Sequence, residues 1–274
     1  MHLKLEILDR TGKVISNVKD QNRIALVHQA KYHKGDKIVF SCDTPGFYQL
    51  RLDDTIPPAL VFIERRMVFP IPFGRMERVC YSPYAFKGVM HLLSAEAAEP
   101  SQIAARRNLA FNPLDQKDVS GIWPHAVSNV QPKMGSLFIA RNAIDGICAS
   151  SRHFPYPYQS WSDTQNPDAE LRIEFGQPVI IDELVLTLRA DYALRSGHPH
   201  DSYWTQGIVE FSDGSREILH FEKGGHPQHF KIAPRTVTCM TLKELIKAEE
   251  EAQFCALRQI EAWGTIFDSL WKSC

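Results

Sequence analysis

The stretch Arg141–Trp161, RNAIDGICASSRHFPYPYQSW, decides how we expect the second half of the chain to fold. It opens with Asn-Ala-Ile-Asp-Gly, which predicts a tight turn, because Gly146 can adopt a positive φ and Asp145 can fold back onto the backbone. A loop rich in aromatic and polar residues follows. The next segment, Ala169–Gly176, alternates between apolar and polar residues and therefore predicts a β-strand with one buried face.

Short strands are predicted along the rest of the chain as well. Apolar or alternating runs recur at intervals of about ten residues, with Gly, Pro and Asp between them. The clearest runs are 2–8, 23–29, 37–41, 47–52, 59–64, 178–189, 204–211, 216–221, 236–242 and 256–264. This pattern predicts an all-β protein built from two antiparallel β-sandwich (jelly-roll) domains.

A short helix is predicted between the two domains. Pro100 and Ser101 open it, and the Ser101 side chain can cap its N-terminus. We expect this helix to connect an N-terminal sandwich, residues 1–105, to a second sandwich, residues 106–274. The helix can equally cover one end of the first sandwich. A segment after it, 243–254, is predicted as a second short helix or a solvated acidic loop.

The sequence resembles the discoidin-like family (F5/8 type C, galactose-binding-like β-sandwiches) in the order of three features. These are Asn-Ala-x-Asp-Gly, a later Trp, and an alternating strand that ends in Phe-Gly. The later order is similar too, with Asp-Glu-Leu-Val-Leu, a hairpin at Phe211–Gly214 and a closing strand at Gln259–Gly264. The resemblance covers residues 109 to 265, although the insert between Asp145 and Trp161 is longer than the family usually has. The whole chain is similar to bacterial two-domain proteins of the carbohydrate-binding type.

Charge and composition limit the partners we expect. The chain has 31 basic and 32 acidic side chains, whereas phosphate binding needs clustered basic charge, so we expect no nucleic-acid partner and no membrane partner. No apolar run approaches the roughly 20 residues of a membrane span. The N-terminus MHLKLEILDR lacks an apolar signal core, so we expect a cytoplasmic protein, or a secreted one if a leader has been removed. The scattered cysteines predict buried, reduced thiols.

A sugar site needs flat aromatic faces and planar polar groups that project from loops of a rigid scaffold. The resemblance implies non-catalytic, lectin-like carbohydrate binding, with these loops at one end of the second sandwich. The candidate ligand-binding residues are His153, Tyr156, Tyr158 and Gln159 in one loop and Arg189, Asp191, His198, His200 and Asp201 in another. Arg189 and Asp191 follow a long predicted strand and are the strongest candidates for orienting hydroxyl groups.

Structural alternatives accompany these candidates. Arg189 and Asp191 can form a plain ion pair, and Tyr156 and Tyr158 can simply pack their loop. The tryptophans at strand ends are expected to fill the core rather than to stack on sugars, and they are Trp161, Trp204 and Trp263.

The resemblance also implies a structural calcium ion beside the Asp-Gly turn. The matching positions are Asn142, Asp145 and Glu261, whose oxygen donors suit a hard cation. An ordinary turn-forming role for Asp145 is the alternative. His198-Pro-His200-Asp201 permits a second metal interpretation, with two imidazoles and a carboxylate, which we do not favour because Pro199 need not let the two rings converge. We therefore expect no required cofactor.

Common catalytic motifs are missing from the sequence. It contains no Gly-x-Ser-x-Gly, no phosphate-binding Gly loop and no His-Glu-x-x-His, although sites on β-sandwiches can assemble from distant loops. Besides carbohydrate binding, two functions therefore stay open. One is a protein-interaction or assembly module of the same fold, which includes association into a homo-oligomer. The other is a metal-dependent enzyme that uses the His198–Asp201 loop.

Overall fold

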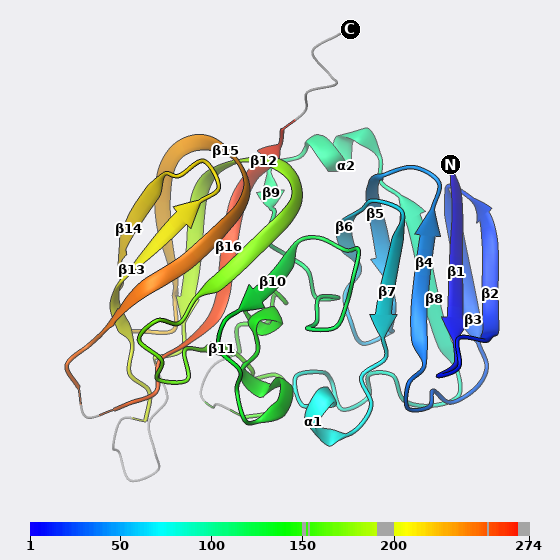
Figure 1. The fold of residues 1–274 in the computed structure, drawn as a ribbon, viewed down its shortest axis with the longest axis horizontal. Helices are drawn as coiled ribbons and strands as arrows, with labels where there is room; N and C mark the ends of the chain where they lie inside the picture. The colour runs from blue at the N-terminus through cyan, green and yellow to red at the C-terminus, as the bar shows by residue number, and fades with distance from the viewer. Residues whose placement is uncertain (150–151, 153, 191–199, 251, 268–274) are drawn as a thin grey trace, which may run out of the picture.

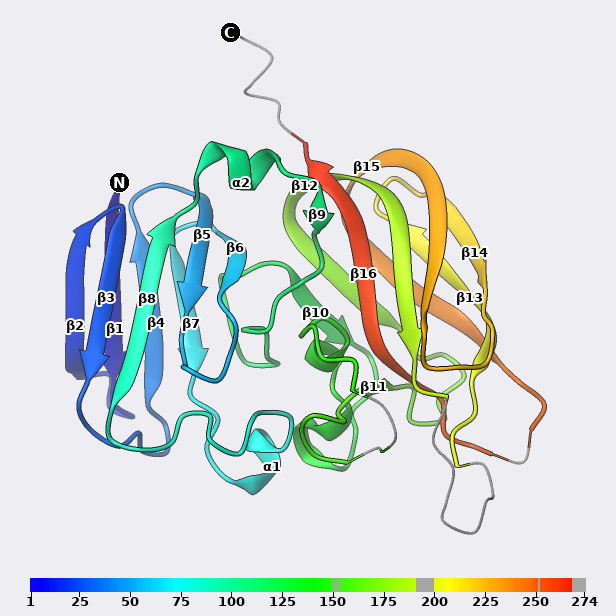
Figure 2. The same cartoon turned by 180° about the vertical axis from the view of Figure 1, so that it is seen from behind.

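The computed structural model describes residues 1–149, 152, 154–190, 200–250 and 252–267 (Figure 1). Two β-sandwiches lie side by side in both views (Figure 1, Figure 2). Every strand pair in the named sheets is antiparallel. The predicted all-β fold is therefore confirmed.

Two four-stranded sheets form the first sandwich. One sheet has the order β2 (Val14–Gln21), β1 (His2–Leu8), β4 (Lys37–Cys42) and β7 (Arg66–Pro70). The other has the order β3 (Arg23–His28), β8 (His91–Ala97), β5 (Gly46–Arg51) and β6 (Ala59–Ile63). Strand β1 shows why the core lies between them: Leu3, Leu5 and Ile7 are fully buried, because successive side chains of a strand point to opposite faces.

The second sandwich is built around one large sheet. Its strand order is β11 (Trp161–Ser162), β16 (Ala256–Ile266), β12 (Leu171–Leu188), β15 (Pro227–Lys247), β13 (Trp204–Phe211) and β14 (Arg216–His220). Two short strands lie outside this order: β10 (His125–Ser128) pairs with β12, and β9 (Arg107–Asn108) pairs with β16. The register of β12 against β15 shifts between Glu174 and Val179 and again between Ile181 and Glu183. Such irregularities bend strands, so that this one sheet folds around its own core.

Two predictions about this sheet are wrong. The segments 169–176 and 178–189 form the single strand β12, because Gly176 bends the chain at a φ of 73° without ending it. Part of the segment predicted as a helix or acidic loop belongs to β15, which continues to Lys247 and pairs there with Trp204 of β13. Pairing with a neighbouring strand therefore outweighs the local helical propensity of Lys243–Lys247.

The segment between β9 and β10 is shared by the two sandwiches. After β9 the chain returns to the first sandwich, where Leu114, Val119 and Ile122 join its core. Trp123 and Phe62 form an antiparallel bridge, with mutual backbone hydrogen bonds of 2.9 and 3.0 Å. The chain then enters the second sandwich again at β10.

The helices are short. They are α1 (Arg75–Arg78), α2 (Pro100–Ala104) and the 3-10 helices η1 (Gly135–Phe138) and η2 (Ala140–Ala143). None in the described part of the chain is long and apolar enough to cross a membrane. The prediction that Ser101 caps α2 is wrong, because the helix begins at Pro100 and Glu99 is its N-cap. The Glu99 N–H donates a hydrogen bond of 2.8 Å to the Gln102 side-chain oxygen.

Two of the three expected core tryptophans fill the core of the second sandwich. Trp161 and Trp204 are buried, with ring centroids 5.9 Å apart. Each indole N–H has a hydrogen-bond acceptor, Ser128 Oγ at 3.1 Å and Asp163 Oδ2 at 3.0 Å. Trp263 differs, because it is only half-buried.

The thiols described by the structure are free, but the prediction that they are buried is wrong for Cys148, which is exposed, and for Cys42, which is half-buried. Cys80, Cys239 and Cys255 are buried. Burial raises the pKa of Cys255 to about 12 and so keeps its thiol protonated.

Candidate functional site

The predicted Asp-Gly turn is present in the loop that follows η2. Gly146 has a φ of 82°, and Asp145 Oδ1 accepts a hydrogen bond of 2.9 Å from the Ile147 N–H. A Cβ at position 146 would lie 2.5 Å from the Phe111 ring, so that glycine is required for space as well as for conformation.

The other oxygen of Asp145 faces buried donors of the same domain. Gln159 Nε2 donates a hydrogen bond of 2.9 Å to Asp145 Oδ2, and Arg141 Nη1 lies 3.6 Å from that oxygen. Burial raises the pKa of Asp145 to about 6, while the Arg141 charge and the Gln159 hydrogen bond oppose the rise. Gln159 is itself buried, so its side chain holds the turn in place.

The donors expected for calcium are engaged by other protein groups. Asn142 uses its amide nitrogen as a donor to three carbonyl oxygens, those of Ser136 at 2.9 Å, Leu137 at 2.9 Å and Ser160 at 3.0 Å. Glu261 accepts a hydrogen bond of 2.6 Å from the Trp263 indole. Within the described ranges, no three His, Cys, Asp or Glu side chains are grouped to hold a metal ion. The calcium site at Asn142, Asp145 and Glu261 therefore stays a prediction from the resemblance.

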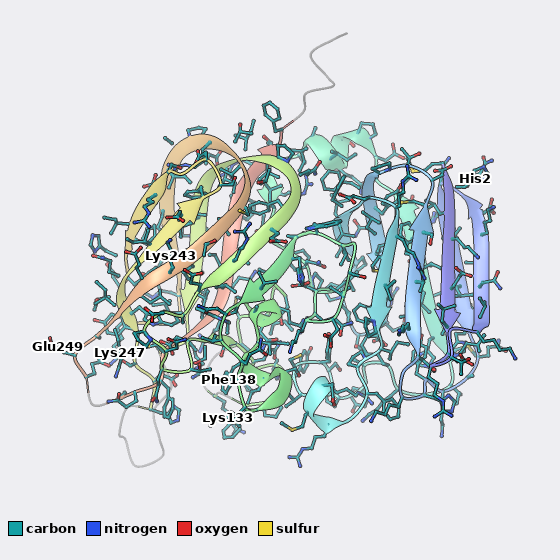
Figure 3. All side chains as sticks on the ribbon, viewed as in Figure 1. His2, Lys133, Phe138, Lys243, Lys247 and Glu249 are labelled. Carbon is teal, nitrogen blue, oxygen red and sulfur yellow. The ribbon has the colours of Figure 1, made fainter. Side chains whose placement is uncertain are left out.

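Arg189 lies in a buried ion-pair cluster. Its side chain is 2% exposed, with Nη2 3.4 Å from Asp201 Oδ1 and Nη1 3.3 Å from Ser160 Oγ. The guanidinium carbon is 5.5 Å from the centroid of the Phe138 ring, which is labelled in Figure 3. Arg189 thus joins the end of β12 to two loops, and sugar contact by Arg189 or by the buried Asp201 stays a prediction.

His200 packs beside this cluster. Its Nδ1 lies 2.9 Å from Asp201 Oδ1, and its ring stacks on Phe254 with centroids 5.1 Å apart. Three other predicted residues, His153, Asp191 and His198, lie outside the described residues, and so does the geometry of the His198–Asp201 metal interpretation.

The aromatic loop 154–159 reaches the first sandwich. Tyr156 and Tyr158 are half-buried. The Tyr158 N–H donates a hydrogen bond of 3.3 Å to the Pro155 carbonyl oxygen, whereas the Tyr156 N–H donates one of 2.8 Å to the Val79 carbonyl oxygen. Among the predicted ligand-binding residues that the structure describes, Tyr156 lines a cavity between the sandwiches.

This cavity, called the junction cavity below, has a volume of about 450 Å³. Its lining comes from both sandwiches: Phe73, Gly74, Arg75, Arg78, Val79, Tyr81, Ser82, Pro83, Lys87, Pro155 and Tyr156. Helix α1 supplies part of this wall and lies between the lower ends of the two sandwiches (Figure 1, Figure 2). Apart from Tyr156, sequence reasoning missed this site. The aromatic-rich segment 81–86 was the available signal, but nothing in the order of the chain places it beside residue 156.

The walls of the junction cavity are tied together. Ser136 Oγ lies 2.9 Å from the Met76 carbonyl oxygen and 3.1 Å from that of Glu77, at the end of α1. The Arg141 guanidinium lies 4.6 Å from the centroid of the Tyr81 ring, and its Nη1 lies 3.3 Å from Cys80 Sγ. Buried contacts from the second sandwich therefore hold residues 76–81 of the first, and the cavity is largely pre-formed.

Two smaller cavities lie nearby, and one of them shares Tyr81 with the junction cavity. Their volumes are about 200 and 260 Å³, and both are lined by Lys117, Gln131, Pro132 and Ile139. His125 lines the first of them, and its Nδ1 is 2.6 Å from the buried Asp115 Oδ1. Burial pushes the pKa of His125 down, but the hydrogen bond and the charge of Asp115 outweigh burial and leave it raised.

Comparison with known proteins yields structural likeness only. The chain matches no family model and no curated protein. Among solved structures, it is similar to the module CpGH89CBM32-4 of Clostridium perfringens, solved with GlcNAc-α-1,4-galactose (16% identity, 59% of this chain and 96% of that one, TM-score 0.39). It is also similar to chitosan-binding module 1 from the chitosanase/glucanase of Paenibacillus sp. IK-5 (15% identity, 58% and 99%, TM-score 0.39).

A fucolectin from the serum of striped bass, Morone saxatilis, matches a larger part of the chain. The match covers 90% of this chain and 86% of the fucolectin at 11% identity, with a TM-score of 0.43. The similar structures are carbohydrate-binding modules and a lectin of the galactose-binding-like type, the family that the sequence resembles. At such TM-scores the likeness says nothing about the site or the ligand of this chain.

Proposed function

We propose that this protein binds carbohydrate without transforming it, and that the sugar lies in the junction cavity between Tyr156 and the segment 73–87. One observation carries the proposal: aromatic rings and nitrogen donors surround a single volume of about 450 Å³. Ligand pockets usually have volumes of about 300 to 1,000 Å³. The expected binding loop of the second sandwich thus supplies one wall, and the first sandwich supplies the other.

The lining suits the two kinds of surface that a sugar presents. The rings of Phe73 and Tyr156 provide apolar faces for the C–H groups of a pyranose ring. The guanidinium groups of Arg75 and Arg78 provide several N–H donors in a planar fork, which can bind neighbouring hydroxyl oxygens.

The lining also favours binding over catalysis. The described lining includes no Asp, Glu or His, and a single carboxylate, that of Glu77, lies beside Gly74 of the lining. Glycoside hydrolysis ordinarily uses a pair of carboxyl groups on either side of the scissile bond. A sugar in this cavity is therefore expected to leave unchanged.

The test compares Tyr156→Ala with Tyr84→Ala in thermal melts and calorimetry across a panel of neutral and acidic monosaccharides. Tyr84 is a matched control, because its side chain is 76% exposed and does not line the cavity. We expect at least one sugar to raise the melting temperature of the wild type and of Tyr84→Ala but not that of Tyr156→Ala. A ligand at about 100 times its Kd adds roughly 2.7 kcal/mol to the free energy of unfolding of a protein that binds it. The anchoring hydrogen bond of Tyr156 comes from its backbone and survives the substitution. An unchanged shift in Tyr156→Ala, or no shift with any sugar, would reject the proposal.

A second candidate is a protein-interaction or assembly module. The segment 73–90 beside the cavity exposes several large apolar side chains: Phe73 (43%), Met76 (47%), Tyr84 (76%), Val89 (55%) and Met90 (58%). Clustered apolar exposure of this kind commonly marks an interaction surface. Sedimentation velocity of the wild type and of Met90→Glu distinguishes this function, because a dimer that the substitution abolishes would support it, and a concentration-independent monomer would count against self-assembly.

A further inference from the structure

The charge of the junction cavity is one-sided. Its described lining contains the cationic side chains of Arg75, Arg78 and Lys87 and no acidic side chain. Among the described residues, no carboxylate oxygen lies within 4.0 Å of a nitrogen of these three side chains. The nearest carboxylates are those of Glu77, whose Oε2 lies beside Gly74 of the lining, and of Asp53, whose charge acts on Arg78, so three positive charges at this volume exceed the negative charge around it.

Several exposed arginines elsewhere on the molecule are paired with carboxylates. Arg51 lies 2.8 Å from Asp54, Arg106 lies 2.7 Å from Asp182, and Arg216 lies 2.7 Å from Glu210. The whole chain carries a formal net charge of −1, so the positive charge at the cavity is a local feature and not a consequence of composition. Such a local field concentrates anions in the cavity.

Arg78 is the least solvated of the three cations. It donates a hydrogen bond to the Ala85 carbonyl oxygen and has no carboxylate in contact among the described residues. Burial lowers the pKa of Arg78, and the charge of Asp53 opposes this only in part. A cation that has lost water without gaining a charged partner is stabilised when an anion arrives.

We infer that the junction cavity selects anionic sugars, with the anionic group among Arg75, Arg78 and Lys87 and the sugar ring packed on Tyr156. This inference rests on the proposed function. The simplest such ligand is a hexuronate, whose planar carboxylate matches the planar fork of a guanidinium in a bidentate pair. A sugar sulfate offers the same negative charge at the same place, and the experiment separates these two sources.

The experiment is titration calorimetry of the full chain at low and high ionic strength. The probes are D-galacturonate, galactose 6-sulfate and galactose, which differ at carbon 6. We expect at least one acidic sugar to bind about tenfold more tightly than galactose, a difference typical of one added charge-assisted pair. High salt should remove most of this preference, because it screens charges that are open to solvent. The tighter of the two acidic sugars identifies the anionic group.

Two double variants locate the charges. Arg75→Gln/Lys87→Gln removes two exposed cations of the cavity and keeps Arg78, whose guanidinium holds the Ala85 carbonyl. Lys19→Gln/Lys231→Gln removes two exposed lysines that do not line the cavity, so that the net charge changes equally. We expect the first double variant to lose the preference for the acidic sugar and to keep galactose binding, and the second to behave as the wild type.

The outcomes separate this inference from the proposed function. Equal, Tyr156-dependent binding of acidic and neutral sugars would overturn the inference and leave the proposed function standing. The same holds for an acidic preference that survives in Arg75→Gln/Lys87→Gln. If acetate binds as tightly as galacturonate, the cavity recognises simple anions, and the inference of an anionic sugar is overturned. If neither kind of sugar binds, the proposed function itself falls.

Discussion

The backbone N–H of Tyr156 donates a hydrogen bond of 2.8 Å to the carbonyl oxygen of Val79. Tyr156 belongs to the long loop of the second sandwich, and Val79 directly follows helix α1 of the first sandwich. This bond places an aromatic ring of one domain beside the cations of the other. Because a main-chain group makes it, the Tyr156 side chain can be changed without releasing the loop.

Arg141 is expected to be the main buried polar group that stabilises the junction. Its Nε donates to the Asp115 carbonyl oxygen at 2.7 Å, its Nη2 donates to that of Pro113 at 2.9 Å, and its charge faces Asp145. Arg141→Met should lower the free energy of unfolding by about 3 to 5 kcal/mol, because it strands a buried carboxylate. Urea denaturation measures the change.

Arg51→Met is the control for that substitution, because the Arg51–Asp54 pair is partly solvated, with side chains 35% and 54% exposed. Arg51→Met should lower the free energy of unfolding by less than about 1 kcal/mol. Equal losses in the two variants would show that Arg141 contributes no more than a surface ion pair.

Gly146→Ala and Gly214→Ala separate backbone strain from steric clash. Both glycines have a φ of 82°, so both substitutions carry the same left-handed cost of about 1 to 2 kcal/mol. A Cβ at position 146 meets the Phe111 ring at 2.5 Å, whereas one at position 214 meets nothing within 4 Å. The free energy of unfolding of Gly146→Ala should therefore be lower than that of Gly214→Ala by about 1 to 3 kcal/mol, which is the typical cost of overpacking a core. Indistinguishable melting curves would contradict the contact with Phe111.

His28 should make the first sandwich sensitive to acid. Burial lowers its pKa, the nearby His91 and His33 lower it further, and Asp36 opposes them. Because the folded pKa lies below the unfolded value of about 6.5, His28 stabilises the fold above that pH, and this stabilisation is lost as the pH falls through the folded pKa. Urea midpoints should fall more steeply with acid in the wild type than in His28→Gln. Parallel curves would mean that His28 titrates alike in both states.

His125 should act in the opposite direction in the second sandwich. Burial lowers its pKa, but the hydrogen bond and charge of Asp115 and the charge of Glu174 together raise it above the usual value. Its stabilisation is therefore complete below about pH 6.5 and is lost as the pH rises through the folded pKa. NMR titration of the His125 ring protons should show this raised pKa, and Asp115→Asn should lower it. A His125 pKa that is unchanged in Asp115→Asn would rule out Asp115 as the cause.

Local pattern alone was enough to predict much of the fold. Alternation in His2–Leu8 and in Leu171–Phe175 reports which face of a strand is buried, and the structure buries those faces. The Asp145–Gly146 turn was predictable because its positive φ and its side-chain hydrogen bond involve neighbouring residues only. The burial of Trp161 and Trp204 follows from their large apolar area.

The candidate site was decided by tertiary structure. The sequence predicted a binding role for the loop that carries Tyr156, which stays a prediction. It could not place Arg75, Arg78 and Lys87 beside that loop, because contacts between domains leave no periodic pattern in a sequence. Arg189 and Gln159 have the chemistry of ligand-binding residues, yet the fold buries both in polar clusters. The sequence alone therefore determined where the strands and turns lie, since these depend on neighbours along the chain. Only packing in three dimensions decided which polar groups support the loops and which line a cavity.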